Sequence, residues 1–223
     1  MAPVLGYWDM RGLAHPIRML LHYVGEEFED RRHTPGPAPD FSLDPWLKIK
    51  FTLGVPFPNL PYWIDGDTKL AQSHAIIRHL ARKHNLCPKS EAETIRCDVI
   101  DYQVNDFTWD LIYVCYNDFF KMGNYEQRRI EYLDKLPSKL KQYSDFLGDF
   151  PWFAGNNLTY VDFMAYEIFE THRAFAPGCL DGFQNLTDYM DRFEALPAIR
   201  KYMQSEEFTK KPYFNKFANW RGD

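Results

Sequence analysis

Few side chains in this sequence combine a reactive type with a position that suits chemistry. Tyr7 stands near the end of a short apolar run, residues 4–8, that is typical of a strand. Its phenol has an ordinary pKa of about 10, so it stays protonated near neutral pH and can donate a hydrogen bond to an anion. Ser73 begins a segment with helical periodicity, where a hydroxyl and free backbone N–H groups suit a carboxylate. Both residues also fit structural roles, Tyr7 as a strand side chain and Ser73 as a helix cap.

The cysteines exclude one common kind of chemistry. The chain has four of them, and they show neither Cys-x-x-Cys spacing nor histidine partners at zinc-finger intervals. Because the first is Cys87, a dithiol redox centre in the N-terminal part of the chain is excluded. Free thiols predict a reducing, cytoplasmic environment, and we expect no metal site. No segment has the pattern of a membrane span or a secretory signal.

Composition and charge are those of a globular protein. The 223 residues carry 26 Lys and Arg against 31 Asp and Glu, a net charge of −5. The pairs of adjacent basic residues, such as Arg31-Arg32, are scattered along the chain and form no stripe, which argues against nucleic acid as a partner. Aromatic residues make up 17% of the chain, which fits either aromatic-lined pockets or an aromatic-rich core.

The elements that must position Tyr7 and Ser73 follow an alternating pattern. A helix opening at Pro16 connects two predicted strands, which makes a βαβ unit. Asp65-Gly66 is a strong hairpin signal between two further short strands. The resulting order is typical of a thioredoxin-like domain. The expected elements are strand 4–8, helix 15–24, strand 28–33, helix 44–51, strands 61–64 and 68–71, and a helix after Gln72-Ser73.

The remainder of the chain is predicted to be helical. Residues 85–90 resemble a linker, so we expect a thioredoxin-like α/β domain over 1–84 and an all-helical domain over 91–223. Thr159 and Asp162 have the spacing of a capping box, which favours a structural role for this carboxylate. The expected helices cover 91–116, 125–147 with a bend or restart at Pro137, 159–175, 185–196 and 197–203.

Several motifs resemble the mu class of glutathione transferases over essentially the whole chain. The N-terminal run Gly6-Tyr7-Trp8-Asp9-Met10-Arg11-Gly12-Leu13-Ala14 is similar to the opening of that class. Further matches are residues 57–62, 64–66, 72–76, 81–87, 151–156 and 161–163, together with the Pro-Gly loop at 34–40. The resemblance implies a cytoplasmic, dimeric detoxification enzyme that transfers the glutathione thiolate to apolar electrophiles such as aryl halides, epoxides and enals. Glutathione is then a co-substrate, and no cofactor is expected.

The implied chemistry gives Tyr7 a role. A thiol of pKa about 8.5 is only about 3% ionised at pH 7, so a donor that stabilises the thiolate is required. The resemblance assigns this donor to Tyr7. It assigns Tyr116 to the electrophile, as a donor to a leaving group or an opening epoxide oxygen.

The resemblance also implies a binding site for each substrate and a dimer interface. Leu60 is expected to precede a cis proline and pair with the cysteinyl unit, while Asp106 is expected to reach the glutathione of the neighbouring subunit. Phe57 is expected to insert into the partner, and Arg78 to meet Asp98 or Asp101 of the partner. The glutathione-binding residues are Trp8, Leu13, Trp46, Lys50, Asn59, Leu60, Gln72, Ser73 and Asp106, and the electrophile pocket adds Met10, Ile112 and Phe208.

The sequence departs from the family pattern in three places, which involve four residues. Leu43 stands where the family often has arginine, Lys48-Ile49 replaces Asn-Glu, and Asn105 takes a usually apolar place in the electrophile pocket. Lys48 either compensates for the missing arginine or is a solvated helix charge. A second hypothesis is a ligand-binding or structural protein on the same fold, because a fold alone does not fix activity. Tyr7, Gln72, Ser73 and Asp106 argue against it.

Overall fold

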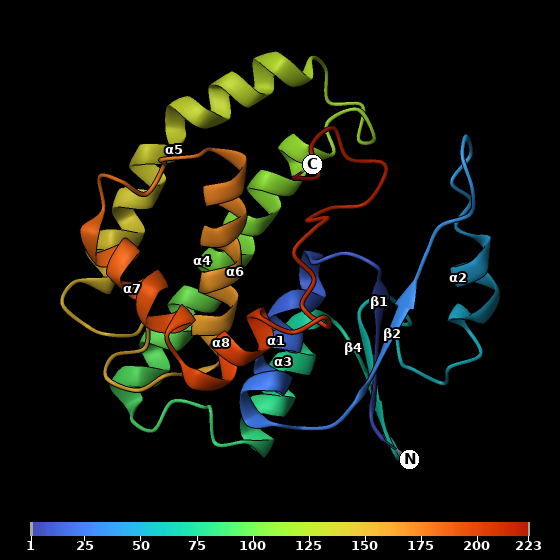
Figure 1. Cartoon of the computed structure of the whole chain (residues 1–223), viewed down its shortest axis with the longest axis horizontal. Coiled ribbons are helices and arrows are strands. Elements are labelled where there is room, and N and C mark those ends of the chain that lie inside the picture. The colour runs from blue at the N-terminus through green and yellow to red at the C-terminus, as the bar shows by residue number, and fades with distance from the viewer. Residues whose placement is uncertain (1, 223) are drawn as a thin grey trace.

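The computed structural model describes residues 2–222, and its elements follow the expected order (Figure 1). An α/β part comes first and a helical part follows. The elements are β1 (Val4–Trp8), a 3-10 turn (Gly12–Ala14), α1 (His15–Val24), β2 (Glu29–His33), α2 (Asp44–Lys50), β3 (Tyr62–Asp65), β4 (Thr68–Ala71), α3 (Ser73–Lys83), α4 (Glu91–Cys115), α5 (Tyr125–Leu147), α6 (Tyr160–Phe175), α7 (Gln184–Glu194) and α8 (Pro197–Met203).

The four strands form one mixed sheet in the order β2-β1-β3-β4. β1 is parallel to β2, as a βαβ unit requires, and antiparallel to β3, while β3 and β4 form the predicted hairpin. Gly66 has a φ of 57° in the turn of that hairpin, a conformation that glycine adopts without steric cost. This topology is the one the sequence predicted for its first part.

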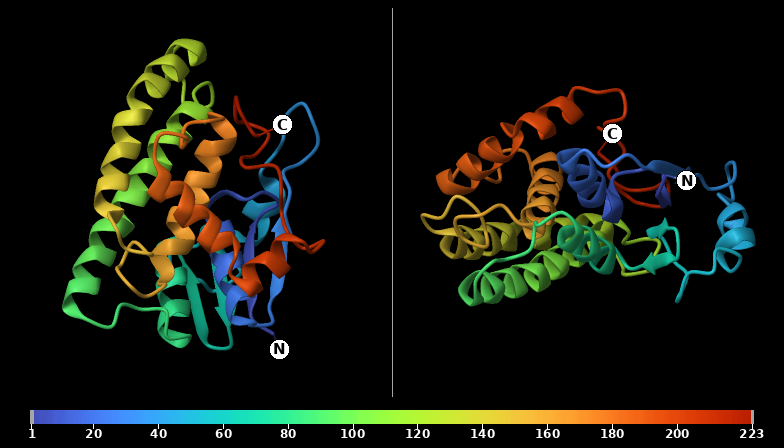
Figure 2. Two further views of the ribbon diagram at one scale, coloured as in Figure 1. Left: turned by 60° about the vertical axis from the view of Figure 1, so that its left-hand side comes forward. Right: turned by 90° about the horizontal axis from the view of Figure 1, so that it is seen from below.

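The two faces of the sheet serve different purposes because strand side chains alternate. Leu5 and Trp63 belong to the main core, into which α1 and α3 also pack. Val4 and Tyr62 point the other way and pack with Trp46 of α2 in a smaller cluster. Figure 2 shows α2 on the outer side of the sheet, away from the helical part. The sheet therefore holds α2, with Trp46, beside the end of β1.

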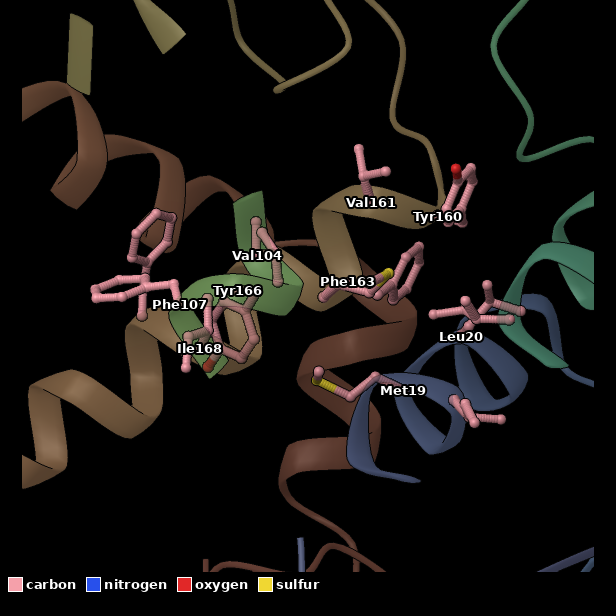
Figure 3. Packing of buried hydrophobic residues seen from close by; sticks show 14 of the residues in the cluster. Met19, Leu20, Val104, Phe107, Tyr160, Val161, Phe163, Tyr166 and Ile168 are labelled. Carbon is pink, nitrogen blue, oxygen red and sulfur yellow. The ribbon is translucent and has the colours of Figure 1, made fainter. Parts of the chain in front are cut away.

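The helical part shares its core with the α/β part. Most residues of α6 are buried, and this helix contacts both α4 and α1. Figure 3 shows that α1, α4 and α6 each contribute side chains to this core, and Met19, Phe107 and Phe163 belong to one buried cluster. The buried Asp162 accepts backbone N–H bonds from Thr159 at 2.8 Å and from Phe153 at 2.9 Å, so the predicted capping role of this carboxylate is confirmed.

Differences from the expected boundaries are small. β3 begins and ends one residue later than predicted, and α7 begins one residue earlier and ends two earlier. α5 continues through Pro137 as one helix, without a restart, and it curves in Figure 1. Among the described residues, no helix is long and apolar enough to cross a membrane.

Candidate active site

A cavity of about 440 Å³ lies between the carboxyl end of β1 and the helical part. Its lining comes from both parts of the chain, with β1, α2 and the start of α3 on one side and α4, α6 and the C-terminal tail on the other. A cavity of this size, mostly apolar with a few polar groups, is typical of small-molecule sites.

Tyr7 lies at the base of this cavity and is 4% exposed. Its phenol oxygen accepts a hydrogen bond from the backbone N–H of Leu13 at 3.1 Å, so the hydroxyl proton remains available to a ligand. Burial raises the pKa of Tyr7 to about 12, although the Leu13 N–H and the charge of Arg18 oppose the shift. The group is therefore a protonated donor at every pH in which a protein of this kind functions.

The turn that carries Leu13 is held by a buried ion pair. Arg11 donates from Nε to one carboxylate oxygen of Glu167 at 3.0 Å and from Nη2 to the other at 2.5 Å, while its backbone N–H bonds the carbonyl of Pro212. Gly12 has a φ of 45°, and a Cβ there would lie 2.7 Å from the Tyr7 oxygen. The turn thus fits closely around the Tyr7 hydroxyl and is fixed to α6 and to the tail.

Four of the polar residues predicted to bind glutathione line the cavity without a hydrogen-bond or ion-pair partner among the described residues. The Trp46 indole, the Lys50 ammonium, the Asn59 amide and the Ser73 hydroxyl form no hydrogen bond or ion pair with any residue from 2 to 222. Trp8, Leu13 and Leu60 also line the cavity, and the Leu60–Pro61 bond is cis, as the resemblance implied. Polar groups gathered in one cavity without internal partners are available to a polar ligand.

Gln72 is the exception among these residues of the α/β part. It is exposed, does not line the cavity, and occupies the N-cap position of α3 with a φ of 73° and no side-chain capping hydrogen bond. A non-glycine residue in this region of φ is uncommon and is often associated with a functional site.

The opposite wall is aromatic and apolar. Met10, Ile112 and Tyr116 line it, as predicted. The Tyr116 hydroxyl oxygen accepts a hydrogen bond from the backbone N–H of Asn215 at 3.0 Å, which leaves its proton free. Burial raises the pKa of Tyr116, so this phenol is also a donor.

Phe208 does not line the cavity, so the prediction that it belongs to the electrophile pocket was wrong. Its ring packs edge-on against His15 and Tyr202, with centroids 5.3 and 5.2 Å away, and over the Arg11 guanidinium. The tail reaches the cavity further along the chain, where Phe214 is 6% exposed and packs against Tyr116. The irregular tail carries no periodicity from which this register could be inferred.

The three departures from the family pattern differ in their location relative to the cavity. Asn105 and Leu43 line the cavity, whereas Lys48 is exposed and does not line it. This position favours the interpretation of Lys48 as a solvated helix charge. Asn105 adds an amide that forms no hydrogen bond with the described residues to the α4 wall.

The residues predicted to form the dimer interface lie outside the cavity. The ring of Phe57 is 87% exposed on the loop before β3. Asp106 is exposed on α4 and does not line the cavity of its own chain. Arg78 forms an ion pair with Asp101 of the same chain, with an N–O distance of 2.6 Å. The prediction that Arg78 pairs with Asp101 of a partner was therefore wrong. Its pairing with Asp98 of a partner stays a prediction.

Several cavity residues were missed from the sequence. Trp109 follows Asn105 by four residues and precedes Ile112 by three, so helical periodicity places it on the same face and was a usable signal. Glu167 gave no such signal, because it acts through a pairing with a distant arginine. Phe119, Phe120, Tyr213 and Phe217 come from irregular segments.

Comparison with known proteins agrees with this architecture. Residues 3–82 match the family model for the glutathione S-transferase N-terminal domain, and residues 105–206 match the model for the C-terminal domain. The solved structure of glutathione S-transferase Blo t 8 has a TM-score of 0.87 at 37% identity and covers 96% of this chain and 98% of its own. The chain therefore belongs to the glutathione S-transferase family.

Curated relatives define the class within the family. Glutathione S-transferase Mu 2 of Mus musculus is 53% identical over 220 residues, which is 99% of each chain. Glutathione S-transferase Mu 3 of Homo sapiens is 51% identical over 217 residues, 97% of this chain and 94% of the relative. The protein is a mu-class glutathione transferase, as its motifs implied.

Proposed function

We propose that this enzyme transfers the glutathione thiolate to apolar electrophiles in detoxification, with Tyr7 as the donor that stabilises the thiolate. The observation that carries the proposal is the Tyr7 phenol, which is buried in the cavity with its oxygen bonded to Leu13 N–H and its proton uncommitted. A hydrogen bond to a charged acceptor contributes about 1.5–3 kcal/mol, which lowers a thiol pKa by about one to two units.

The free polar groups around Tyr7 support one orientation of glutathione. Lys50, Trp46 and Asn59 lie toward α2 and the loop before β3 and suit the glycyl carboxylate and peptide groups. Ser73, at the first position of α3, offers a hydroxyl and the positive end of the helix dipole to the γ-glutamyl carboxylate. The Leu60 backbone suits the cysteinyl unit between them, and Gln72 adds an amide beside Ser73.

The aromatic wall receives the electrophile in this proposal. Met10, Ile112 and Phe214 supply apolar surface, and Tyr116 supplies a proton donor. Substitution at an aryl halide, opening of an epoxide and addition to an enal all place negative charge on the electrophile. Tyr116 stabilises that charge where it develops on oxygen, as in an epoxide.

We further propose that the enzyme functions as a cytoplasmic homodimer. The exposed ring of Phe57 would be stabilised by burial against an apolar surface of a partner. One face of α4 carries exposed apolar side chains at helical spacing, together with Asp106: Ile95, Val99 and Tyr102. The four cysteines are free thiols, which supports a reducing compartment. We assign residues 1–84 to a glutathione-binding domain, 85–90 to a linker and 91–223 to a helical domain.

Retention on immobilised glutathione, followed by assay against an aryl halide, an epoxide and an enal, tests this function. We expect retention, elution by free glutathione, and turnover of at least the aryl halide. Retention without turnover of any of the three electrophiles would favour a ligand-binding protein instead. Failure to bind glutathione would refute both alternatives.

Replacing Tyr116 separates its role in chemistry from its role in packing. Tyr116→Phe retains the ring and removes the donor, so we expect epoxide opening to slow by about tenfold and aryl halide substitution to change little. Steady-state rates with both substrates at saturating glutathione provide the measurement. An equal effect on the two substrates would show that Tyr116 serves the packing of the tail.

A further inference from the structure

The turn at residues 11–13 decides in which direction the Tyr7 hydroxyl donates. Tyr7 lies on β1, so the sheet fixes its ring, but the hydroxyl proton can still rotate about the C–O bond. A phenol proton lies near the plane of the ring on one of two sides, and an N–H that donates to the oxygen occupies one of them. The Leu13 N–H, 3.1 Å from the Tyr7 oxygen, is that donor. The position of Leu13 therefore controls the proton that the proposed function uses.

One side chain connects this turn to α6. Arg11 is 2% exposed and donates from Nε and Nη2 to the two carboxylate oxygens of Glu167, at 3.0 and 2.5 Å. Two parallel bonds of this kind fix the direction of the guanidinium as well as its distance from the carboxylate. Glu167 is 7% exposed on a helix whose residues are mostly buried, so close packing holds it in place.

The C-terminal tail holds the same turn from another direction. The carbonyl of Pro212 accepts from the Arg11 N–H at 2.9 Å, and the carbonyl of Tyr213 accepts from the Gly12 N–H at 3.1 Å. The Arg11 guanidinium lies over the Tyr213 ring, 4.6 Å from its centroid. The Tyr213 hydroxyl in turn donates to Glu170 of α6 at 3.2 Å. The Arg11 side chain is therefore the point at which α6, the tail and the turn meet.

We propose that Arg11 and Glu167 are positioning residues for the reaction, whose ion pair holds the Leu13 N–H against the Tyr7 oxygen and so keeps the Tyr7 proton directed at the thiolate. Neither side chain touches the sulfur in this role. A donor that is oriented before the charge forms stabilises that charge without further reorganisation. The proposal rests on the proposed function, because it acts through the same phenol.

The charge of Glu167 would act in the opposite direction. Glu167 lines the cavity, so removal of its negative charge alone would stabilise a thiolate there and lower the thiol pKa, whereas a misplaced Tyr7 hydroxyl would raise it. The test therefore uses changes that keep the net charge of the pair. Arg11→Lys keeps the positive charge and loses the two parallel bonds. Arg11→Met combined with Glu167→Met removes one charge of each sign, and apolar replacement of a buried ion pair commonly preserves the fold.

Ultraviolet titration of the bound thiolate measures the effect. We expect the pKa of the bound glutathione thiol to rise by about 0.5 unit in Arg11→Lys and by about one unit in the double variant, which is about threefold and tenfold less thiolate below that pKa. The value of kcat/KM near pH 6.5 should fall by similar factors, while the dissociation constant for glutathione stays within about threefold. Arg173→Met combined with Glu194→Met is the matched control, because this pair joins α6 to α7 at 2.7 Å outside the cavity, and it should leave the thiol pKa unchanged.

A Tyr7→Phe background separates positioning of the hydroxyl from a general loss of structure. Because the pair acts through that hydroxyl, the double variant should add less than about twofold to the loss of rate that Tyr7→Phe already causes. Fully additive losses, or a thiol pKa that is unchanged or lowered in the double variant, would overturn the proposal. Arg11→Lys, which retains the charge, provides the same test with the same outcomes if the double variant does not fold. Wild-type protein that does not lower the pKa of bound glutathione would instead refute the role of Tyr7 in the proposed function.

Discussion

Tyr7→Phe should raise the pKa of the bound glutathione thiol by about one to two units and slow conjugation near pH 6.5 by about 10- to 100-fold. The substitution removes the hydrogen bond that the Tyr7 phenol donates to the thiolate. A charge-assisted hydrogen bond of this kind stabilises the thiolate by about 1.5–3 kcal/mol. Because the Tyr7 ring remains, affinity for glutathione should change little. The pKa of Tyr7 itself is about 12, so the phenol should not titrate in the range where the thiol does.

Ultraviolet titration of the bound thiolate, with rates measured over the same pH range, checks this result. The rate of the variant should approach that of the wild type as pH rises above the shifted thiol pKa, because the thiolate then forms without help. Tyr23→Phe is the matched control, since Tyr23 is a half-buried tyrosine on α1 that does not line the cavity. An unchanged titration curve in Tyr7→Phe would remove Tyr7 from this role.

Phe57→Ser should dissociate the dimer and weaken glutathione binding with it. Full burial of an aromatic ring contributes about 1.5–3 kcal/mol, and a two-fold interface uses the ring twice. The dimer dissociation constant should therefore rise by at least about 100-fold. Affinity for glutathione should fall in parallel because Asp106 of the partner is then lost from the site, although Phe57 does not line the cavity.

Sedimentation velocity and glutathione titration on the same samples test the two parts of this prediction. Phe51→Ser removes another exposed ring of the same domain, 77% exposed at the end of α2, and should leave the dimer intact. Asp106→Asn should lower glutathione affinity in a protein that remains dimeric. A monomeric Phe57→Ser protein with undiminished affinity would contradict a site shared between subunits.

The sequence predicted the elements well because local signals define them. Pro16, Gly66 and the capping pair Thr159 and Asp162 each mark a boundary by a backbone preference that does not depend on distant residues. The alternation of strands and helices then restricts the topology of the first part to a few possibilities. The position of Tyr7 beside the cavity follows from that topology.

Distant pairings could not be predicted in the same way. Tyr116 accepts its hydrogen bond from a backbone N–H of the tail, and any residue type at position 215 except proline would provide it. The pair formed by Arg11 and Glu167 joins residues 156 positions apart. Phe208 and Phe214 are both aromatic residues of an irregular segment, so only the folded chain distinguishes the ring that enters the cavity.

The common core of α1, α4 and α6 has a consequence for the route by which molecules enter and leave. Two domains joined only by a small, polar interface would admit a substrate by a hinge motion that separates them. Here such a motion would expose Met19 and Phe163 to water, at a cost of several kcal/mol. Substrate and product are therefore expected to enter and leave without opening this core. Phe119 and Phe217 line the cavity from the turn after α4 and from the tail, and their ring centroids lie 5.7 Å apart. We therefore expect the release of bulky products to depend on how readily the turn after α4 and the tail separate.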